Sequence, residues 1–216
     1  LEILKGMSEY TPLLIKLERS LLFKISFMLL LLFNFKFSVA LPKCNGDFSK
    51  QCFADINHKN GERYVGEVEN YKYNGKGTYL YINGNIYEGK FKNGMQNGHG
   101  VFSFSNGDRY EGDFKDGLFH GNGESSYVNG EKYIGQFEND LPNGKGTQIL
   151  PNGDKYIGQF VNGFRSGKGV LTFTNGDEYV GDFKDNLFNG DGKYTFSNGD
   201  KQKGLFKNNK FLGLKE

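Results

Sequence analysis

Hydrophobic and polar positions alternate in short stretches along most of the chain, and the alternation itself recurs every 23 residues. In one unit the alternating stretches run over residues 87–91 and residues 100–104. Period-two alternation of this kind predicts half-buried β-strands. Six units follow one another without a gap, and they open at Tyr64, Tyr87, Tyr110, Tyr133, Tyr156 and Tyr179, with a partial unit opening at Gln202. The repeat predicts one extended array in which each unit contacts only its neighbours.

Each unit reaches the next through a loop, which contains Asn106-Gly107 in the unit from Tyr87. An Asn-Gly pair first suggests a two-residue hairpin loop, but that loop would place the aromatic residues of neighbouring strands on opposite faces. A three-residue loop closed by the glycine places them together, and their joint burial is favourable at about 25 cal/mol per Å². In that register Gly100 lies opposite Gly112, and a neighbouring tyrosine ring can cover the space that the two glycines leave.

The repeated motifs are Tyr-x-Gly at the start of each unit, Gly-x-Gly in the middle and Asn-Gly near the end. This signature resembles the MORN repeat (membrane occupation and recognition nexus) over residues 64–216. The resemblance implies an all-β fold, in which stacked β-hairpins form a single-layer antiparallel sheet that is elongated and gutter-like. Three departures are small: Val68 replaces an aromatic residue, Tyr71 replaces a glycine and Gln202 replaces the last tyrosine.

Residues 41–63 precede the repeats and carry both cysteines, Cys44 and Cys52. In register, Cys52 and Ala54 stand where later units have the Gly-x-Gly pair, so this segment is expected to be a degenerate half-repeat that closes the first edge of the sheet. An even cysteine count in an exported chain predicts a disulfide between them. Two free thiols are the expectation for a cytosolic protein.

Residues 1–40 have a different pattern. Basic residues precede an apolar run at residues 25–33, and Ser38-Val39-Ala40 follows with small residues where an exporting peptidase cleaves. These features are typical of a cleavable helical signal peptide, and the run is short for a membrane span of about 20 residues. The sequence therefore predicts export to the periplasm, the cell envelope or the medium, with cleavage after Ala40. A membrane anchor over residues 20–40 is the alternative.

Charge limits the classes of partner. The whole chain has a net charge of +2, and it is neutral once residues 1–40 are excluded. Nucleic-acid binding needs a basic footprint and attraction to anionic lipids needs a basic cluster, whereas both signs are interleaved in these repeats. The chain has no kinase motif, so a lipid-kinase assignment would reflect the repeat alone.

Residues that could carry chemistry are few. The three histidines occupy different repeat positions without metal-ligand spacing, so no metal, cofactor or catalytic role is predicted for His58, His99 and His120. Several aspartates follow the Asn-Gly turns, but the dense oxygen cage of a calcium loop is missing. A role in stabilising the turns is favoured for Asp108, Asp154, Asp177 and Asp200.

Candidate partner-binding residues lie in two regions. The aromatic groove offers Tyr87, Phe104, Tyr110, Tyr127, Tyr133 and Tyr156. The loop rim offers apolar residues in place of polar ones, at Leu118-Phe119, Phe164 and Leu187-Phe188. The alternative role of both sets is structural, because the rings can pack on one another and the loop residues can pack beneath the loops.

Three functions follow from these features. A non-enzymatic, exported scaffold that binds a protein partner through the groove or rim is favoured. A peripheral membrane or phospholipid-binding module is the alternative that the resemblance suggests. An enzyme is disfavoured, because no carboxylate pair stands apart from the repeat pattern. Open sheet ends also allow a homodimer.

Overall fold

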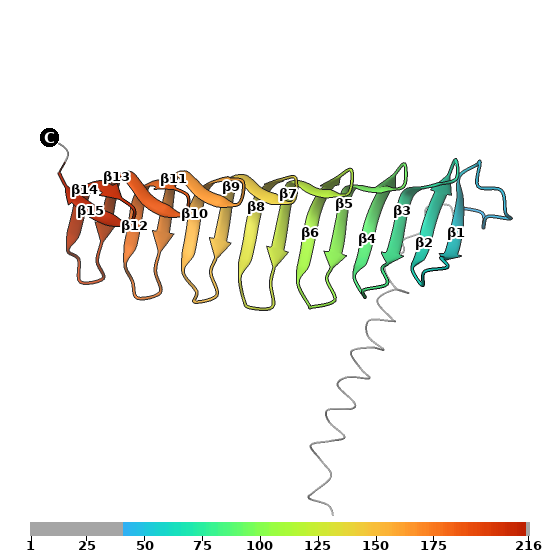
Figure 1. The fold of residues 1–216 in the computed structure, drawn as a ribbon, viewed down its shortest axis with the longest axis horizontal. Coiled ribbons are helices and arrows are strands. Elements are labelled where there is room, and N and C mark those ends of the chain that lie inside the picture. Colours follow the sequence, from blue (N-terminus) through green and yellow to red (C-terminus); the bar gives the residue numbers. More distant parts are fainter. Residues whose placement is uncertain (1–40, 215–216) are drawn as a thin grey trace, which may run out of the picture. The chain divides into compact units, whose positions relative to one another are not determined.

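The computed structural model describes residues 41–214, so the expected signal segment lies outside the described residues. These residues form one antiparallel sheet of 15 strands, in which every strand pairs with its neighbours in sequence (Figure 1). The predicted all-β array of stacked hairpins is confirmed. The strands are β1 (Cys52–Asn57), β2 (Arg63–Glu69), β3 (Lys72–Leu80), β4 (Ile86–Lys92), β5 (Met95–Ser103), β6 (Arg109–Lys115), β7 (Leu118–Ser126), β8 (Lys132–Glu138), β9 (Leu141–Ile149), β10 (Lys155–Val161), β11 (Phe164–Thr172), β12 (Glu178–Lys184), β13 (Leu187–Thr195), β14 (Lys201–Lys207) and β15 (Lys210–Gly213).

Two kinds of hairpin loop alternate along the array. The expected three-residue loop joins β5 to β6, where the amide of Gly107 donates to the carbonyl of Phe104 at 3.0 Å. A two-residue turn joins β4 to β5, and its residues Asn93 and Gly94 both have positive φ, at 54° and 89°. The second strand of each unit therefore begins directly after this turn. In the unit from Tyr87 it covers Met95–Ser103, whereas the alternation indicated residues 100–104. Successive three-residue loops line one edge of the array, and successive two-residue turns line the other.

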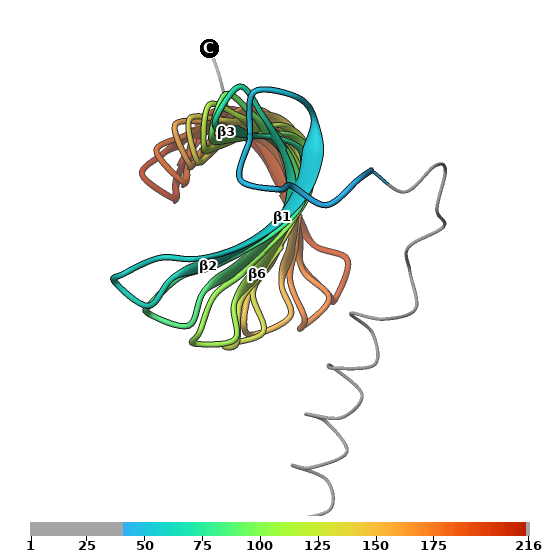
Figure 2. The same ribbon diagram turned by 90° about the vertical axis from the view of Figure 1, so that its right-hand side faces the viewer.

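The glycine pairs lie where the sheet bends. Gly100 is opposite Gly112 on one side, as the alternation predicted, and opposite Gly89 on the other. An added Cβ at Gly100 would lie 2.5 Å from Tyr87 Oη, so the Tyr87 ring occupies the space that the missing side chains leave. The register also shifts between Gly89 and Phe91, and such a bulge increases the local bend. Viewed end-on, the strands form a curved wall between the two rows of loops (Figure 2).

The core follows the concave side of this wall, which we call the inner face. Two buried rows run along it: a tyrosine at the start of each full unit and, four residues later, a phenylalanine, with Val68 in its place in the first unit. The rings meet edge to face, as where Tyr110 lies 5.2 Å from Phe114 and 5.0 Å from Phe137 of the next unit. Each unit thus buries its apolar surface against its neighbour, which is why one repeat alone could not form a stable core.

The first edge of the sheet is covered by residues 42–48. Cys44 is disulfide-bonded to Cys52, with a Cα–Cα distance of 5.1 Å. The amide of Cys44 donates to the carbonyl of Phe53, and the amide of Phe53 donates to the carbonyl of Pro42. The edge of β1 therefore has part of its backbone paired within the chain. Among residues 41–214, no helix is long and apolar enough to span a bilayer.

Candidate functional site

The tyrosines proposed to line a binding groove are core residues. Tyr87, Tyr110 and Tyr156 have no solvent-accessible surface, and Tyr133 is almost completely buried. Each hydroxyl donates to the backbone carbonyl three residues ahead, as from Tyr110 to Asp113 at 2.8 Å. These four rings cannot contact a partner directly, because neighbouring units cover them. They form the platform on which more accessible side chains lie.

A second layer of side chains covers each buried tyrosine from the inner side. Phe119 stacks on Tyr110 and Phe188 stacks on Tyr179, each with ring centroids 3.7 Å apart. Phe119 and Phe188 do not project from the loops, since strand alternation turns their rings inward onto Tyr110 and Tyr179. Of the expected rim residues, Phe164 is half exposed beside the two-residue turns.

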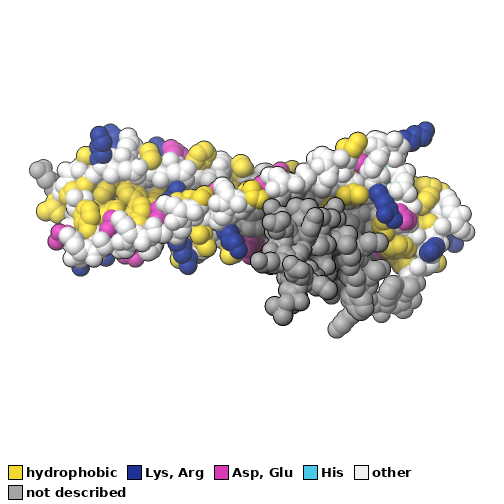
Figure 3. All heavy atoms as spheres, turned by 90° about the horizontal axis from the view of Figure 1, so that it is seen from below, with side chains coloured by type: hydrophobic (Ala, Val, Ile, Leu, Met, Phe, Trp, Pro, Cys, Tyr) yellow, Lys and Arg dark blue, Asp and Glu magenta, His cyan; other side chains and the backbone are white. Residues whose placement is uncertain are grey.

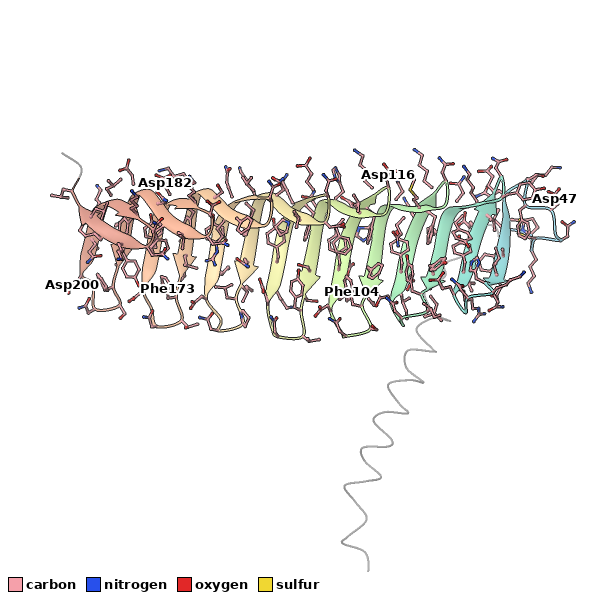
Figure 4. The ribbon with its side chains drawn as sticks, in the orientation of Figure 1. Asp47, Phe104, Asp116, Phe173, Asp182 and Asp200 are labelled. Atoms are coloured by element: carbon pink, nitrogen blue, oxygen red, sulfur yellow. A yellow bond between two sulfur atoms is a disulfide. The ribbon has the colours of Figure 1, made fainter. Side chains whose placement is uncertain are left out.

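Two further candidates remain accessible at the inner face. Phe104 packs against Phe102 at 4.7 Å and is partly exposed, and Tyr127 is 42% exposed. Phe104 and Phe173 lie toward the three-residue loops, whereas Asp116 and Asp182 lie toward the two-residue turns (Figure 4). Seen from below, hydrophobic side chains gather at the C-terminal end of the array and also show near its N-terminal end (Figure 3). The accessible aromatic surface is therefore carried by the second layer and not by the tyrosine row.

The second layer changes character in the middle of the array. Here Ser125 and Gln148 replace the aromatic residue that follows the Gly-x-Gly motif, and Arg165 occupies the position of Phe119 and Phe188. Ser125 and Gln148 both lie opposite Tyr133, on β7 and β9. The Arg165 guanidinium carbon lies 5.6 Å from the ring centroid of Tyr156. We call Ser125, Gln148 and Arg165 the polar centre.

The polar centre contains unpaired hydrogen-bonding atoms. Ser125 Oγ, Gln148 Oε1 and Arg165 Nε are buried and have no hydrogen-bond partner within the described part of the chain. The other end of the Gln148 amide is satisfied, because Nε2 donates to Glu131 Oε1 at 2.6 Å. A buried polar atom without a partner costs about 1–3 kcal/mol, so these atoms are suited to a ligand that completes their bonding.

Burial also affects the charges around the polar centre. It lowers the pKa of Arg165, an effect that nearby Tyr156, Glu131 and Asp154 oppose. Burial disfavours the Asp154 carboxylate, yet hydrogen bonds from Thr174 and the Asn152 side chain hold the pKa of Asp154 below its usual value. The region therefore combines one guanidinium with two nearby carboxylates and does not form a simple anion site.

The aspartates after the Asn-Gly turns form rungs between successive loops. Asp177 Oδ1 accepts from the amide of Ser197 at 2.8 Å, and Oδ2 accepts from Tyr194 Oη at 2.6 Å. Asp154 accepts from the amide and hydroxyl of Thr174 in the same way. These contacts give the carboxylates a role in stabilising the turns.

One histidine approaches acidic groups on the next strand. His99 Nδ1 lies 3.8 Å from Asp113 Oδ1, and His99 Nε2 lies 3.9 Å from Glu111 Oε1. His58 Nε2 is hydrogen-bonded to Tyr73 Oη at 2.6 Å. Within residues 41–214, no cluster of His, Cys, Asp and Glu has the arrangement of a metal site.

Sequence reasoning did not identify the polar centre or the grouping of His99 with Asp113. The polar centre had only a weak signal. Ser125, Gln148 and Arg165 stand at positions that other units fill with aromatic residues, but Gln96, Pro142 and Leu171 interrupt the same two columns. The histidine grouping had none, since it depends on the register between β5 and β6.

A comparison with known protein families identifies the repeat. The MORN repeat profile matches residues 64–86, 87–109, 110–132, 133–155, 156–178 and 179–201. No curated protein sequence matches the chain.

Solved structures offer a weaker likeness. The TCP domain of Drosophila melanogaster SAS-4 (dCPAP), solved with a proline-rich motif of Ana2, is 15% identical with a TM-score of 0.42, and the match covers 80% of this chain and 99% of that one. The TCP10 domain of Danio rerio CPAP is 12% identical with a TM-score of 0.25, over 70% of this chain and 83% of that one. At these scores neither likeness supports an inference about partners.

Proposed function

The chain belongs to the MORN repeat family, and we propose that it is a non-enzymatic scaffold that binds an extended peptide segment of a protein partner along its inner face. The observation that carries this proposal is the polar centre. It places unpaired donors and acceptors among aromatic side chains, on a surface that continues over several units. Binding surfaces commonly combine an apolar lining with a few placed polar groups.

A peptide group matches the chemistry of the unpaired atoms. These atoms are buried, so the peptide reaches them when the partly exposed Gln148 and Arg165 side chains rotate toward it. Its carbonyl accepts a hydrogen bond, as the Nε–H of Arg165 requires, and its amide donates one, as Oε1 of Gln148 requires. The neighbouring aromatic side chains offer apolar contact to the flanking side chains, with Phe119 on one side and Phe173 on the other. A phospholipid headgroup fits less well, because Glu131 and Asp154 lie near the guanidinium and would repel a phosphate.

The test is a peptide-display screen against the full chain, followed by calorimetry with the selected peptides. Arg165→Met and Gln148→Leu remove the unpaired atoms at similar size. Gln148→Leu also removes the donor to Glu131 Oε1, so urea unfolding of each variant separates an effect on stability from an effect on binding. Both variants should weaken peptide binding about tenfold or more, since charged and polar anchors typically dominate. Lys145→Met is the matched control, because Lys145 belongs to the same part of the array but faces the opposite side of the sheet.

Two results would count against the proposal. Selected peptides that bind Arg165→Met and wild type equally would remove the polar centre from the site. Salt-sensitive co-sedimentation with anionic liposomes, in the absence of peptide binding, would favour the phospholipid-binding alternative.

Export is part of the same proposal. Residues 1–40 support it by their sequence pattern, and the Cys44–Cys52 disulfide supports it because such bonds persist in oxidising compartments. The test is the intact mass of the protein from its native host, with and without reductant. A chain that begins at Leu41 and gains two hydrogens on reduction is expected, whereas a full-length reduced chain would overturn export and favour a membrane anchor.

A further inference from the structure

Along the array, three-residue loops hold an aromatic residue opposite a carboxylate. The amide of Phe104 donates to the carbonyl of Asp108 at 2.9 Å, and the amide of Tyr127 donates to the carbonyl of Glu131 at 2.9 Å. Residues that face each other across a hairpin in this way place their side chains on the same face of the sheet. We call each such pair a loop pair, and the loop pairs are Phe104–Asp108, Tyr127–Glu131, Phe173–Asp177 and Phe196–Asp200.

The loop pairs belong to the inner face. Glu131 Oε1 accepts from Gln148 Nε2 at 2.6 Å, and Asp177 Oδ2 accepts from Tyr194 Oη at 2.6 Å. Both donors lie in the second layer that covers the buried tyrosines. The rings of the loop pairs are accessible, most of all Tyr127. A ligand on the inner face therefore meets a ring and a carboxylate at each of these loops (Figure 4).

The carboxylates of the loop pairs form no ion pair within residues 41–214. The groups that donate to them are neutral amides and hydroxyls. Basic residues follow Asp108 and Glu131 in the sequence, but strand alternation turns Arg109 and Lys132 to the opposite face, where Arg109 pairs with Glu111. The inner face thus presents a line of carboxylates that no cation of the described chain pairs with.

The Asp108 loop pair also lacks a donor that other loop pairs have. Tyr194 and Gln148 each donate to a carboxylate 17 residues earlier in the chain. Ser125 has the same spacing from Asp108, but its side chain is too short to make that bond. Ser125 is only 4% exposed, and its Oγ has no hydrogen-bond partner in the part of the chain that the structure describes. A lysine ammonium that enters between Asp108 and Ser125 can donate to both, since it has three donors.

The chain already holds one cation in a similar environment. The loop that interrupts the series has Leu150 in place of a ring, and in this part of the array the Arg165 guanidinium carbon lies 5.6 Å from the ring centroid of Tyr156. The charges of Glu131 and Asp154 favour the protonated guanidinium. A cation above a ring face is attracted by the ring as well. The same combination of ring and carboxylate is open to a ligand cation at the loop pairs.

The spacing of the loop pairs selects the conformation of a peptide ligand. Equivalent loops are two strands apart, which is about 9.6 Å at about 4.8 Å per strand. A polyproline II segment rises about 3.1 Å per residue and has three residues per turn, so every third side chain recurs on one side after about 9.3 Å. A β-strand repeats its side after two residues, or about 6.6 Å, and does not match.

We propose that the partner segment is basic, and that it lies along the inner face in an extended conformation with Lys or Arg side chains at every third residue, each against one loop pair. This inference rests on the proposed function, because it names the chemistry of the peptide that the inner face binds. Charge complementarity of this kind gives specificity and raises the rate of association.

Calorimetry with synthetic peptides tests the charge and the spacing. The probe is a proline-rich peptide of about 12 residues with lysine at every third position, which extends over about 37 Å. It should bind at least about tenfold tighter than the same peptide with glutamine at those positions, and its affinity should fall as salt is added. A peptide with the same lysines in one consecutive block should bind more weakly, because its charges cannot reach successive loop pairs.

Asp108→Asn removes one carboxylate and keeps the loop. Asn85 stands at the equivalent position of an earlier loop, where its Oδ1 accepts from the amide of Ser105 at 2.9 Å, as Asp108 Oδ1 accepts from the amide of Val128 at 2.9 Å. The variant should therefore fold normally and weaken binding of the lysine peptide about threefold to tenfold.

Two further variants complete the test. Tyr127→Leu should weaken the lysine peptide about twofold to fivefold through the lost contact between cation and ring, and Leu150 shows that the array accepts leucine at this position. Glu88→Gln is the matched control, because it makes the same change of charge as Asp108→Asn at an exposed residue on the opposite face. It should leave the affinity unchanged.

The outcomes separate this inference from the proposed function. Equal binding of the lysine and glutamine peptides, equal binding of spaced and clustered lysines, or equal effects of Glu88→Gln and Asp108→Asn would overturn the inference. Display-selected peptides that lack basic residues, yet lose affinity in Arg165→Met, would overturn it and leave the proposed function in place. The absence of any bound peptide, selected or synthetic, would overturn both.

Discussion

Gly123→Ala tests whether a tyrosine ring, and not backbone conformation, requires the glycine row. An added Cβ at Gly123 would lie 2.5 Å from Tyr110 Oη and 2.7 Å from two carbons of that ring. The ring cannot move aside easily, because it is fully buried and its hydroxyl donates to the Asp113 carbonyl. The backbone at Gly123 does not have the positive φ that favours glycine, so alanine is acceptable there in other respects.

The expected magnitude follows from two opposing effects. Overpacking a well-filled core costs about 1–3 kcal/mol, and displacement of the Tyr110 hydroxyl adds about 1 kcal/mol for a lost hydrogen bond. Against this, replacing glycine by alanine at a compatible position stabilises by about 0.4–1 kcal/mol through the unfolded chain. The free energy of unfolding should therefore fall by about 1–3 kcal/mol.

Urea unfolding followed by far-ultraviolet circular dichroism measures this change. The control is Ala54→Gly, because Ala54 occupies the same row in the cap, opposite Gly66, where no repeat tyrosine precedes it. A double-mutant cycle with Tyr110→Leu isolates the contact between ring and Cβ. The reasoning is refuted if Gly123→Ala stabilises the protein, or if its cost is the same with leucine at position 110.

The remaining predictions concern pH, the cap and the turns. Burial raises the pKa of Tyr133 to about 12, and because the unfolded chain ionises first near pH 10, stability should fall by about 1.4 kcal/mol per pH unit per such tyrosine between these values. Phenolate absorbance should then rise together with loss of the β-sheet signal, and ionisation without unfolding would contradict this. Reduction of the Cys44–Cys52 bond should lower the free energy of unfolding by about 2–3 kcal/mol. Hydrogen-exchange protection should be lost only in residues 41–63, and a uniform loss of protection along the sheet would contradict a local role. Asp177→Ala should lower the free energy of unfolding in urea by about 1–3 kcal/mol, because it removes the hydrogen bond to the next loop. Asp200→Ala should change this free energy little, because Asp200 has no such bond to a further loop in the described residues. Equal effects of the two variants would exclude the bonds between loops as the cause.

Several features of the fold were predictable because they depend on neighbours in sequence. The parity of aromatic residues around Asn106-Gly107 fixed the three-residue loop, and the same parity placed Gly100 opposite Gly112. The Tyr-x-Gly spacing was enough to identify a ring above a glycine pair. These inferences succeeded because an array with a fixed period repeats one local solution, so each unit tests the others.

The candidate site was less predictable, since exposure is set by how units stack. Tyr110 is of a residue type that often lines binding sites, yet the next unit covers it completely. Phe119 follows a turn and reads as a rim residue, yet alternation within β7 turns its ring onto Tyr110. A side chain's accessibility depends on atoms that lie tens of residues away, and no local pattern encodes it.

The sequence by itself determined the repeat, the strand pairing and the aromatic side of the sheet, because period and parity follow from covalent order and from the burial of apolar surface. Only the tertiary structure decided which groups are accessible and which lack partners. Stacking left the Arg165 Nε and Gln148 Oε1 atoms unpaired among aromatic rings. It also covered the Tyr110 ring completely with the neighbouring unit. Both outcomes depend on packing between units, which acts in three dimensions and leaves only isolated departures from the repeat in the sequence.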